Sequence, residues 1–173
     1  RLAQLKQEIE AGCGSKVEMI PVDLSREEGV DRLFHRSVEL AGIYAVINNA
    51  GITGYGITKL EEMDLYRDIM AVNFHALMKL SLLFLPYFVE RGEGALLNIT
   101  SMGAFVPTPY QNIYAASKHA AQAFSEGLYR EYESYRKNGI IISSFAPGGI
   151  RTEMITNSGL DKKHPLDSPY NMD

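Results

Sequence analysis

The sequence is poor in cysteine, in excess positive charge and in long hydrophobic runs. Cys13 is the only cysteine among 173 residues, which excludes internal disulfides and thiolate metal clusters and fits a reducing compartment, so we expect a cytoplasmic protein. The net charge of −4 argues against a partner bound through phosphate charge, so neither nucleic acid nor an anionic membrane surface is expected. The longest apolar run, residues 80–89, is shorter than the roughly 20 residues of a membrane span.

Metal-ligand spacing is also missing. The four histidines are scattered along the chain, and none stands at the distances in sequence that metal sites use. We therefore predict no metal site. They are His35, His75, His119 and His164.

The composition is that of a globular protein. Hydrophobic residues make up 46% of the chain and charged residues 22%, and the length suits one domain spanning residues 1–173.

Periodicity predicts strands that alternate with helices. Strands are expected at 16–22, 43–47, 95–100 and 139–146, and helices at 1–11, 25–41, 61–90 and 112–137. Ser25, followed by Glu28, is expected to form a capping box at the start of the second helix. Such alternation predicts an α/β fold, a parallel sheet with helices on both faces.

Polar residues follow three of these strands directly, namely Asn48 to Gly51, Thr100-Ser101, and Pro147 to Gly149. Ligands of open parallel sheets bind where the strands end, so these groups are expected along one edge.

Tyr114 and Lys118 stand four residues apart on a predicted helix, so their side chains share one face. An isolated tyrosine, with a pKa of about 10, is a poor base, but a nearby cation makes a phenol more acidic. Such a pair can act as a general acid or base on a hydroxyl or carbonyl oxygen. Ser101, at a strand end, can offer the same oxygen a second hydrogen bond. Taken alone, Tyr-x-x-x-Lys is common on helices where the tyrosine packs and the lysine is solvated.

The pair belongs to an ordered set that resembles the short-chain dehydrogenase/reductase family over residues 1–155. The set comprises Asn48-Asn49-Ala50-Gly51, Asn73, Ser101, Tyr114, Lys118 and the run from Pro147 to Thr152. The resemblance implies an incomplete Rossmann-like, three-layer α/β/α fold.

The resemblance also implies roles for the catalytic set. Tyr114 matches the acid/base, Lys118 the residue that acidifies it and binds the nicotinamide ribose, and Ser101 the serine that orients the substrate oxygen. Asn73 matches an asparagine that holds a water of the proton relay.

The implied cofactor is NADP or NAD, with NADP favoured by the Arg1-Leu2 helix opening. Asp23 and Leu24 resemble the adenine contact, and the segment 49–51 the adenine ribose contact. The nicotinamide would lie on the residues after the last strand. The implied cofactor-binding residues are Asp23, Leu24, Asn49, Ala50, Gly51, Tyr114, Lys118, Pro147, Gly148, Gly149, Ile150 and Thr152.

One family element is missing, because the pyrophosphate-binding pattern Gly-x-x-x-Gly-x-Gly occurs nowhere in the sequence. In the strand order 3-2-1-4-5-6, two strands would lie between those at 16–22 and 43–47, and a further strand would follow the last one. We therefore expect a fragment of a longer enzyme that folds poorly by itself.

The expected reaction interconverts a secondary alcohol and a ketone on a small-molecule substrate, whose pocket would be lined by 54–56 and 105–111. A nucleotide-sugar epimerase or dehydratase and a non-catalytic dinucleotide sensor or scaffold remain alternatives. The helices at 61–90 and 112–137 are expected to form a homodimer or homotetramer. The second of them carries a seam of small residues, Ala116, Ala120, Ala123 and Gly127.

Overall fold

A computed structural model describes residues 2–40, 42–137 and 139–148. The expectations for Gly149, Ile150 and Thr152, and the cofactor hint at Arg1, lie outside the described residues.

The centre of the molecule is a parallel sheet of three strands in the order β1-β2-β3. The strands are β1 (Ala45–Asn48), β2 (Gly94–Ile99) and β3 (Ile140–Phe145), close to three of the four predicted strands. Their short apolar runs suit strands whose neighbours lie in a buried parallel sheet. In register, Asn48 pairs with Asn98 and Ile99 with Phe145, so the three strands end at one edge.

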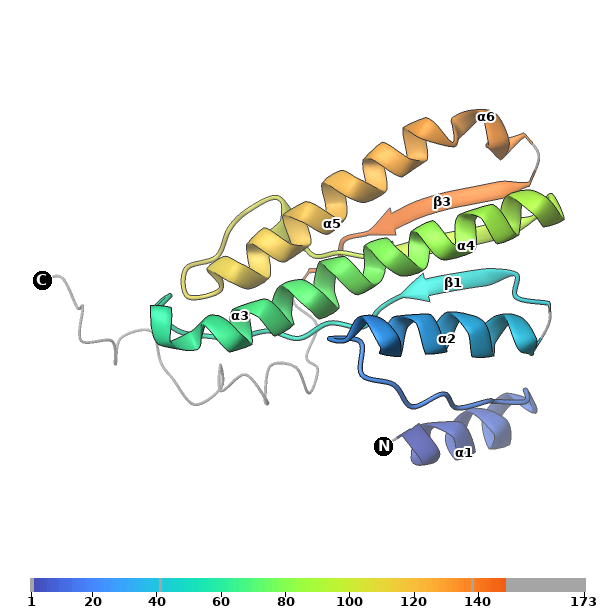
Figure 1. Cartoon of the computed structure of the whole chain (residues 1–173), viewed down its shortest axis with the longest axis horizontal. Helices are drawn as coiled ribbons and strands as arrows, with labels where there is room; N and C mark the ends of the chain where they lie inside the picture. The colour runs from blue at the N-terminus through green and yellow to red at the C-terminus, as the bar shows by residue number, and fades with distance from the viewer. Residues whose placement is uncertain (1, 41, 138, 149–173) are drawn as a thin grey trace, which may run out of the picture.

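Three helices cover one face of this sheet. Figure 1 shows α2 (Glu27–Glu39), α4 (Leu77–Arg91) and α5 (Asn112–Glu131) side by side, with α4 in the middle. Their apolar stripes meet the sheet in one core that includes Phe84, Phe88 and Leu96. On the opposite face, Ile47 and Phe145 remain 61% and 56% exposed, so the described residues supply one of the two expected helix layers.

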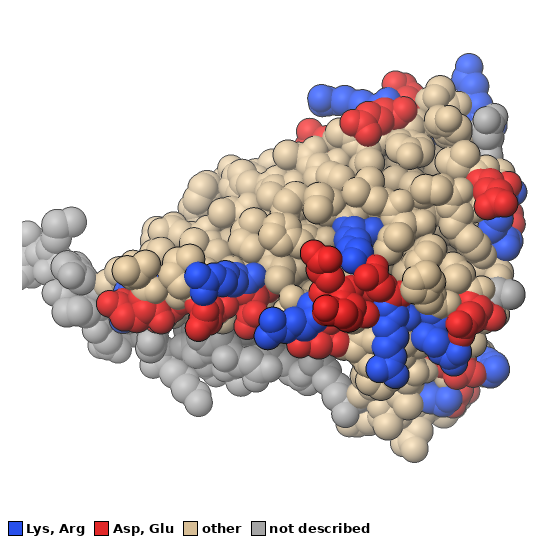
Figure 2. All heavy atoms as spheres, viewed as in Figure 1, with Lys and Arg blue, Asp and Glu red and all other residues tan. Residues whose placement is uncertain are grey.

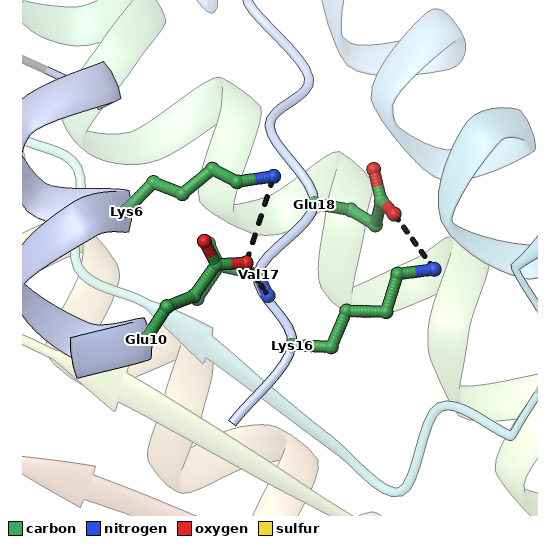
Figure 3. A network of polar contacts seen from close by, with 5 residues as sticks. All are labelled: Lys6, Glu10, Lys16, Val17 and Glu18. Atoms are coloured by element: carbon green, nitrogen blue, oxygen red, sulfur yellow. Dashed lines mark hydrogen bonds and ion pairs between the residues drawn. The ribbon is translucent and has the colours of Figure 1, made fainter. Parts of the chain in front are cut away.

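The predicted strand at 16–22 is wrong, because the segment from Gly14 to Asp23 has no regular secondary structure. A strand needs a neighbour for its backbone N–H and C=O groups, and the described residues place no strand beside this one. Polar contacts hold the segment to α1 (Leu2–Cys13) instead. Figure 3 shows that Glu10 accepts a hydrogen bond from the Val17 backbone at 3.0 Å and pairs with Lys6 at 3.6 Å.

The predicted capping box at Ser25 is also wrong. The N-cap of α2 is Arg26, and no side chain caps the helix. Ser25 donates both its backbone N–H and its hydroxyl to Asp23 Oδ1, at 2.9 and 2.7 Å. A capping serine would have to accept from the backbone N–H groups at the start of the helix. The Ser25 hydroxyl is instead oriented toward the Asp23 carboxylate, to which it donates a charge-assisted hydrogen bond.

The predicted helix at 61–90 is nearly continuous but changes its winding. A 3₁₀ turn (Leu60–Glu62) leads into α3 (Met63–Met70), a π-helical segment (Ala71–Ala76) and α4, which ends at Gly92 with φ 71°. Single π turns inside α-helices are frequent at functional sites. This one contains Asn73.

The span Leu60–Arg91 is long and apolar enough to cross a membrane, with a mean hydropathy of 1.5 over its best window. Of that window, 44% is buried inside the protein, where α4 packs on β2. Core helices of globular proteins meet the same criteria, so the span alone does not indicate a membrane protein.

A buried polar network fixes the pairing of β1 with β2. Asn48 Nδ2 donates to Asn98 Oδ1 at 2.8 Å and lies 3.2 Å from Ser81 Oγ on α4. Asn98 Nδ2 donates to Ser125 Oγ on α5 at 2.9 Å. A shift of one residue in register would leave these buried groups without partners, so the network opposes it.

Candidate active site

Tyr114 and Lys118 lie on the face of α5 that meets the end of β2. Lys118 Nζ lies 5.9 Å from the centre of the Tyr114 ring and donates to the Ile99 carbonyl at 2.9 Å. The lysine is only 3% exposed, and burial lowers its pKa to about 8. At pH 7 it therefore remains mostly protonated, a positive charge beside the phenol.

Ser101 comes directly after β2 and caps a 3₁₀ turn, Met102–Ala104, by accepting a hydrogen bond from Gly103 N at 3.0 Å. A Cβ on Gly103 would lie 3.4 Å from Ser101 Oγ and 3.7 Å from Tyr114 Cε1. The serine and the tyrosine thus flank the same small space. The structure brings Ser101, Tyr114 and Lys118 together at one strand end.

Asn73 is fully buried in the π-helical segment. Its Oδ1 accepts from Ile52 N at 2.8 Å, and its Nδ2 donates to Ile52 O at 2.9 Å and to Ser117 Oγ at 3.0 Å. Both amide N–H groups are thus used by protein atoms. The side chain clamps the loop after β1 to α5, and the water contact that the resemblance implies for Asn73 stays a prediction.

Ser117 is a member of this arrangement that the sequence did not reveal. Its hydroxyl accepts from Asn73 and lies 2.7 Å from the Tyr114 carbonyl, to which it donates. It therefore connects the clamp to the turn of α5 that carries the tyrosine. The only signal in the sequence is its position between Tyr114 and Lys118. That signal is weak, because serines in helices commonly bond the carbonyl one turn earlier without contacting another element.

The residues expected to contact the cofactor lie at the same edge. The segment 49–51 follows β1 directly, and Pro147 and Gly148 follow β3. Pairing continues past the sheet, because Thr100 N donates to Phe145 O at 2.8 Å and Met102 N to Pro147 O at 3.0 Å.

The start of α2 lies toward the end where β1 stops (Figure 1). Asp23 and Leu24 precede that start by a few residues. Leu24 packs against the hydrophobic core. Asp23 is exposed, and the hydrogen bonds from Ser25 lower the pKa of its carboxyl. Asp23 thus exposes its side chain while Leu24 is partly buried, and the adenine contact of both residues stays a prediction.

Two loops contact each other near the start of α5. Gly56 N donates to Tyr110 O at 2.9 Å, and the rings of Tyr55 and Tyr110 lie 5.5 Å apart. Asn112 Nδ2 donates to Thr58 Oγ1 at 3.1 Å. Together with Tyr114, these loops line a small pocket. Tyr110 has a φ of 69°, a strained value for a residue with a side chain, which these contacts maintain.

Among the described residues, no three His, Cys, Asp or Glu side chains gather as a metal ion would require. The prediction of a metal-free site stays a prediction.

Comparison with known proteins gives consistent results. A family model described as short chain dehydrogenase matches residues 1–163. The very-long-chain 3-oxoacyl-CoA reductase of Anas platyrhynchos is 32% identical over 95% of this chain and 54% of its own length. Estradiol 17-beta-dehydrogenase 2 of Rattus norvegicus is 29% identical over 86% of this chain and 39% of its own length. The chain thus spans about half or less of the relatives it matches.

Among solved structures, a short-chain dehydrogenase from Sphingobium yanoikuyae in complex with NADPH superimposes with a TM-score of 0.80. It is 30% identical and covers 91% of this chain, which in turn covers 60% of that protein. This similarity confirms the predicted α/β fold class.

Proposed function

The chain belongs to the short-chain dehydrogenase family, and we propose that it carries the acid/base site of an NAD(P)-dependent oxidoreductase that interconverts a secondary alcohol and a ketone. The proposal rests on the buried Lys118 ammonium, which lies 5.9 Å from the centre of the Tyr114 ring. Ser101 lies close by, because Gly103 is next to both the serine hydroxyl and the tyrosine ring. Tyr114 also lines a small pocket formed with the loops that contain Tyr55 and Tyr110.

In the reducing direction, Tyr114 Oη donates its proton to the carbonyl oxygen, and in the oxidising direction it takes the hydroxyl proton. Ser101 Oγ donates a hydrogen bond to the same oxygen as negative charge develops there. The Lys118 ammonium stabilises the tyrosinate that forms when the proton leaves. A nicotinamide, when bound, supplies or accepts the hydride.

The residues at the sheet edge fit such a cofactor. Ala50 and Gly51 are small, and a Cβ on Gly148 would meet no atom of the described residues within 4 Å, so these residues leave the backbone open to a ligand. We propose that 49–51 hold the adenine ribose, Asp23 the adenine and Pro147-Gly148 the nicotinamide. The NADPH bound by the Sphingobium relative supports NADP, although NAD stays possible on this chain's own residues. The roles of Gly149, Ile150 and Thr152 remain predictions.

The test is Tyr114→Phe in the full-length protein. This change removes the proton donor and keeps the ring, so we expect turnover with ketones and NADPH to be lost while NADPH binding, measured by fluorescence, persists. Lys118→Ala should weaken both turnover and binding. Tyr129→Phe, at an exposed position on the same helix, is the matched control and should leave both unchanged. Near-normal rates for Tyr114→Phe would refute the assignment.

We also propose that α4 and α5 form a homo-oligomer interface, a homodimer or homotetramer. Figure 2 shows a broad surface over these helices that is nearly free of charged side chains. Leu82 is 50% exposed there, and Ala116 and Ala123 are exposed on α5, where small side chains let a second helix approach. A strictly monomeric full-length protein in multi-angle light scattering would contradict this.

A cytoplasmic location is proposed from the single cysteine, which is exposed and free. Recovery of the full-length protein in the soluble fraction after high-speed centrifugation supports it. Recovery with membranes would contradict it and would draw attention to the span Leu60–Arg91.

A further inference from the structure

The end of β2 meets α5 through consecutive residues. Ile99 O accepts the Lys118 ammonium at 2.9 Å, and Thr100 Oγ1 donates to Gln122 Oε1, also at 2.9 Å. Lys118 and Gln122 are four residues apart, so they lie on one face of α5, one turn after the other. Ser101 comes next along the chain. The Thr100–Gln122 hydrogen bond is therefore part of the same junction of strand and helix that holds the reacting groups.

The Gln122 amide ties three elements together. Besides accepting from Thr100, it donates through Nε2 to Ser144 Oγ on β3 at 3.2 Å and to Glu126 Oε1 on α5 at 2.9 Å. Thr100 is 2% exposed, and its hydroxyl also lies 3.3 Å from Phe145 O. With the acceptor and both donors of the amide engaged, one orientation satisfies every group. The amide thus fixes the position of α5 relative to the ends of β2 and β3.

We propose that Thr100 and Gln122 are positioning residues for the Tyr114–Lys118 pair, a role that rests on the proposed function. Lys118 has a flexible four-carbon stem, and Ile99 O is its one hydrogen-bond partner among the described residues. The position of its ammonium therefore depends on the position of the α5 backbone relative to β2. The Thr100–Gln122 hydrogen bond fixes that position one helical turn after Lys118. Misplacing a catalytic group by about 1 Å can cost as much as 10²-fold in rate, so a small slip of the helix matters.

If Thr100 had a purely structural role, replacing it would lower the free energy of unfolding without altering the acid/base pair. Ser125 provides the matched control for this comparison. It is also 2% exposed and also bonds α5 to β2, through Asn98 at 2.9 Å. It lies seven residues beyond Lys118, about 10 Å along the helix. Ser125→Ala and Thr100→Val each remove one buried hydroxyl between the same strand and the same helix.

The experiment compares these two variants, and Thr100→Ser as a rescue, in the full-length protein. Titration of ¹³C-labelled lysine by NMR follows Lys118, and the rate of NADPH-dependent ketone reduction is measured against pH. In Thr100→Val we expect the Lys118 titration midpoint to rise by about half a unit or more, because water reaches the ammonium. We expect kcat to fall about tenfold with little change in KM. Ser125→Ala should move neither, and Thr100→Ser should restore both.

Equal shifts in Thr100→Val and Ser125→Ala, or no shift in Thr100→Val, would overturn the positioning role. If Thr100→Val does not fold, Gln122→Met replaces it, because it breaks the same bond from the less buried side. An unaltered protein that reduces no ketone would refute the proposed function instead. The NMR titration would then decide the positioning role by itself.

Discussion

Lys118 makes the stability of this protein depend on pH in an unusual direction. Burial lowers its pKa from 10.5 to about 8 in the folded state. Below pH 8 both the folded and the unfolded chain carry the proton, and the cost of the buried charge is fully present. Between pH 8 and 10.5 the unfolded chain binds more protons than the folded one, so this group makes the free energy of unfolding rise with pH.

The size of the effect follows from the shift. A fall from 10.5 to about 8, at about 1.4 kcal/mol per pKa unit, corresponds to about 3 kcal/mol. Solvent does not screen this group appreciably, because only 3% of the residue is exposed. Lys118→Met removes the ammonium and keeps an unbranched side chain. The variant also leaves Ile99 O without its partner, but that loss changes little with pH.

The measurement is urea unfolding of the unaltered protein and of Lys118→Met from pH 6 to 10.5. Subtracting the two free energies of unfolding cancels the groups that titrate in both proteins. We expect the stability of the unaltered protein, relative to the variant, to increase by about 3 kcal/mol over this range. Lys59→Met, at an exposed position, should give a difference that stays flat. Parallel curves for Lys118→Met would show that the lysine is not buried as described.

Three further substitutions test the packing around the site. Asn73→Ala should lower the free energy of unfolding by about 1–3 kcal/mol, since it removes the hydrogen-bond partner of the part-buried N–H and C=O of Ile52; an unchanged thermal midpoint would contradict the clamp. Gly94→Ala should destabilise the protein by at least about 1–3 kcal/mol, because its Cβ would lie 2.2 Å from the ring of the fully buried Phe88. Within one protomer, a Cβ on Gly127 would meet no atom of the described residues within 4 Å. Under dilute, monomeric conditions Gly127→Ala should therefore add about 1 kcal/mol of helix stability, visible as a higher urea midpoint, and a loss of stability under those conditions would contradict this geometry.

Much of the fold could be predicted from local pattern. The apolar runs at 43–47 and 139–146 form strands. The helix predicted at 61–90 ends with α4, whose C-cap is Gly92, as expected. These elements are specified by residues within a few positions of one another. The prediction of a strand at 16–22 was wrong because a strand depends on residues far away in the sequence. Its backbone groups need a neighbouring strand, which local pattern cannot supply.

Ser25 failed in a similar way. Its position and the glutamate three residues later satisfy the pattern of a capping box, but Asp23 competes for the same hydroxyl. Two local interactions were possible there, and only the folded backbone determined which of them formed.

The sequence alone placed Tyr114 and Lys118 on one helical face and Ser101 at the end of a strand, because helix periodicity and the alternation of strands with helices are local properties. Tertiary structure decided how these groups are held: the burial that lowers the pKa of Lys118, the clamp from Asn73 to Ile52, and the amide of Gln122 across the ends of two strands. Each of these joins residues at least nineteen positions apart. Such contacts depend on how the helices pack on the sheet, which spacing along the chain does not encode.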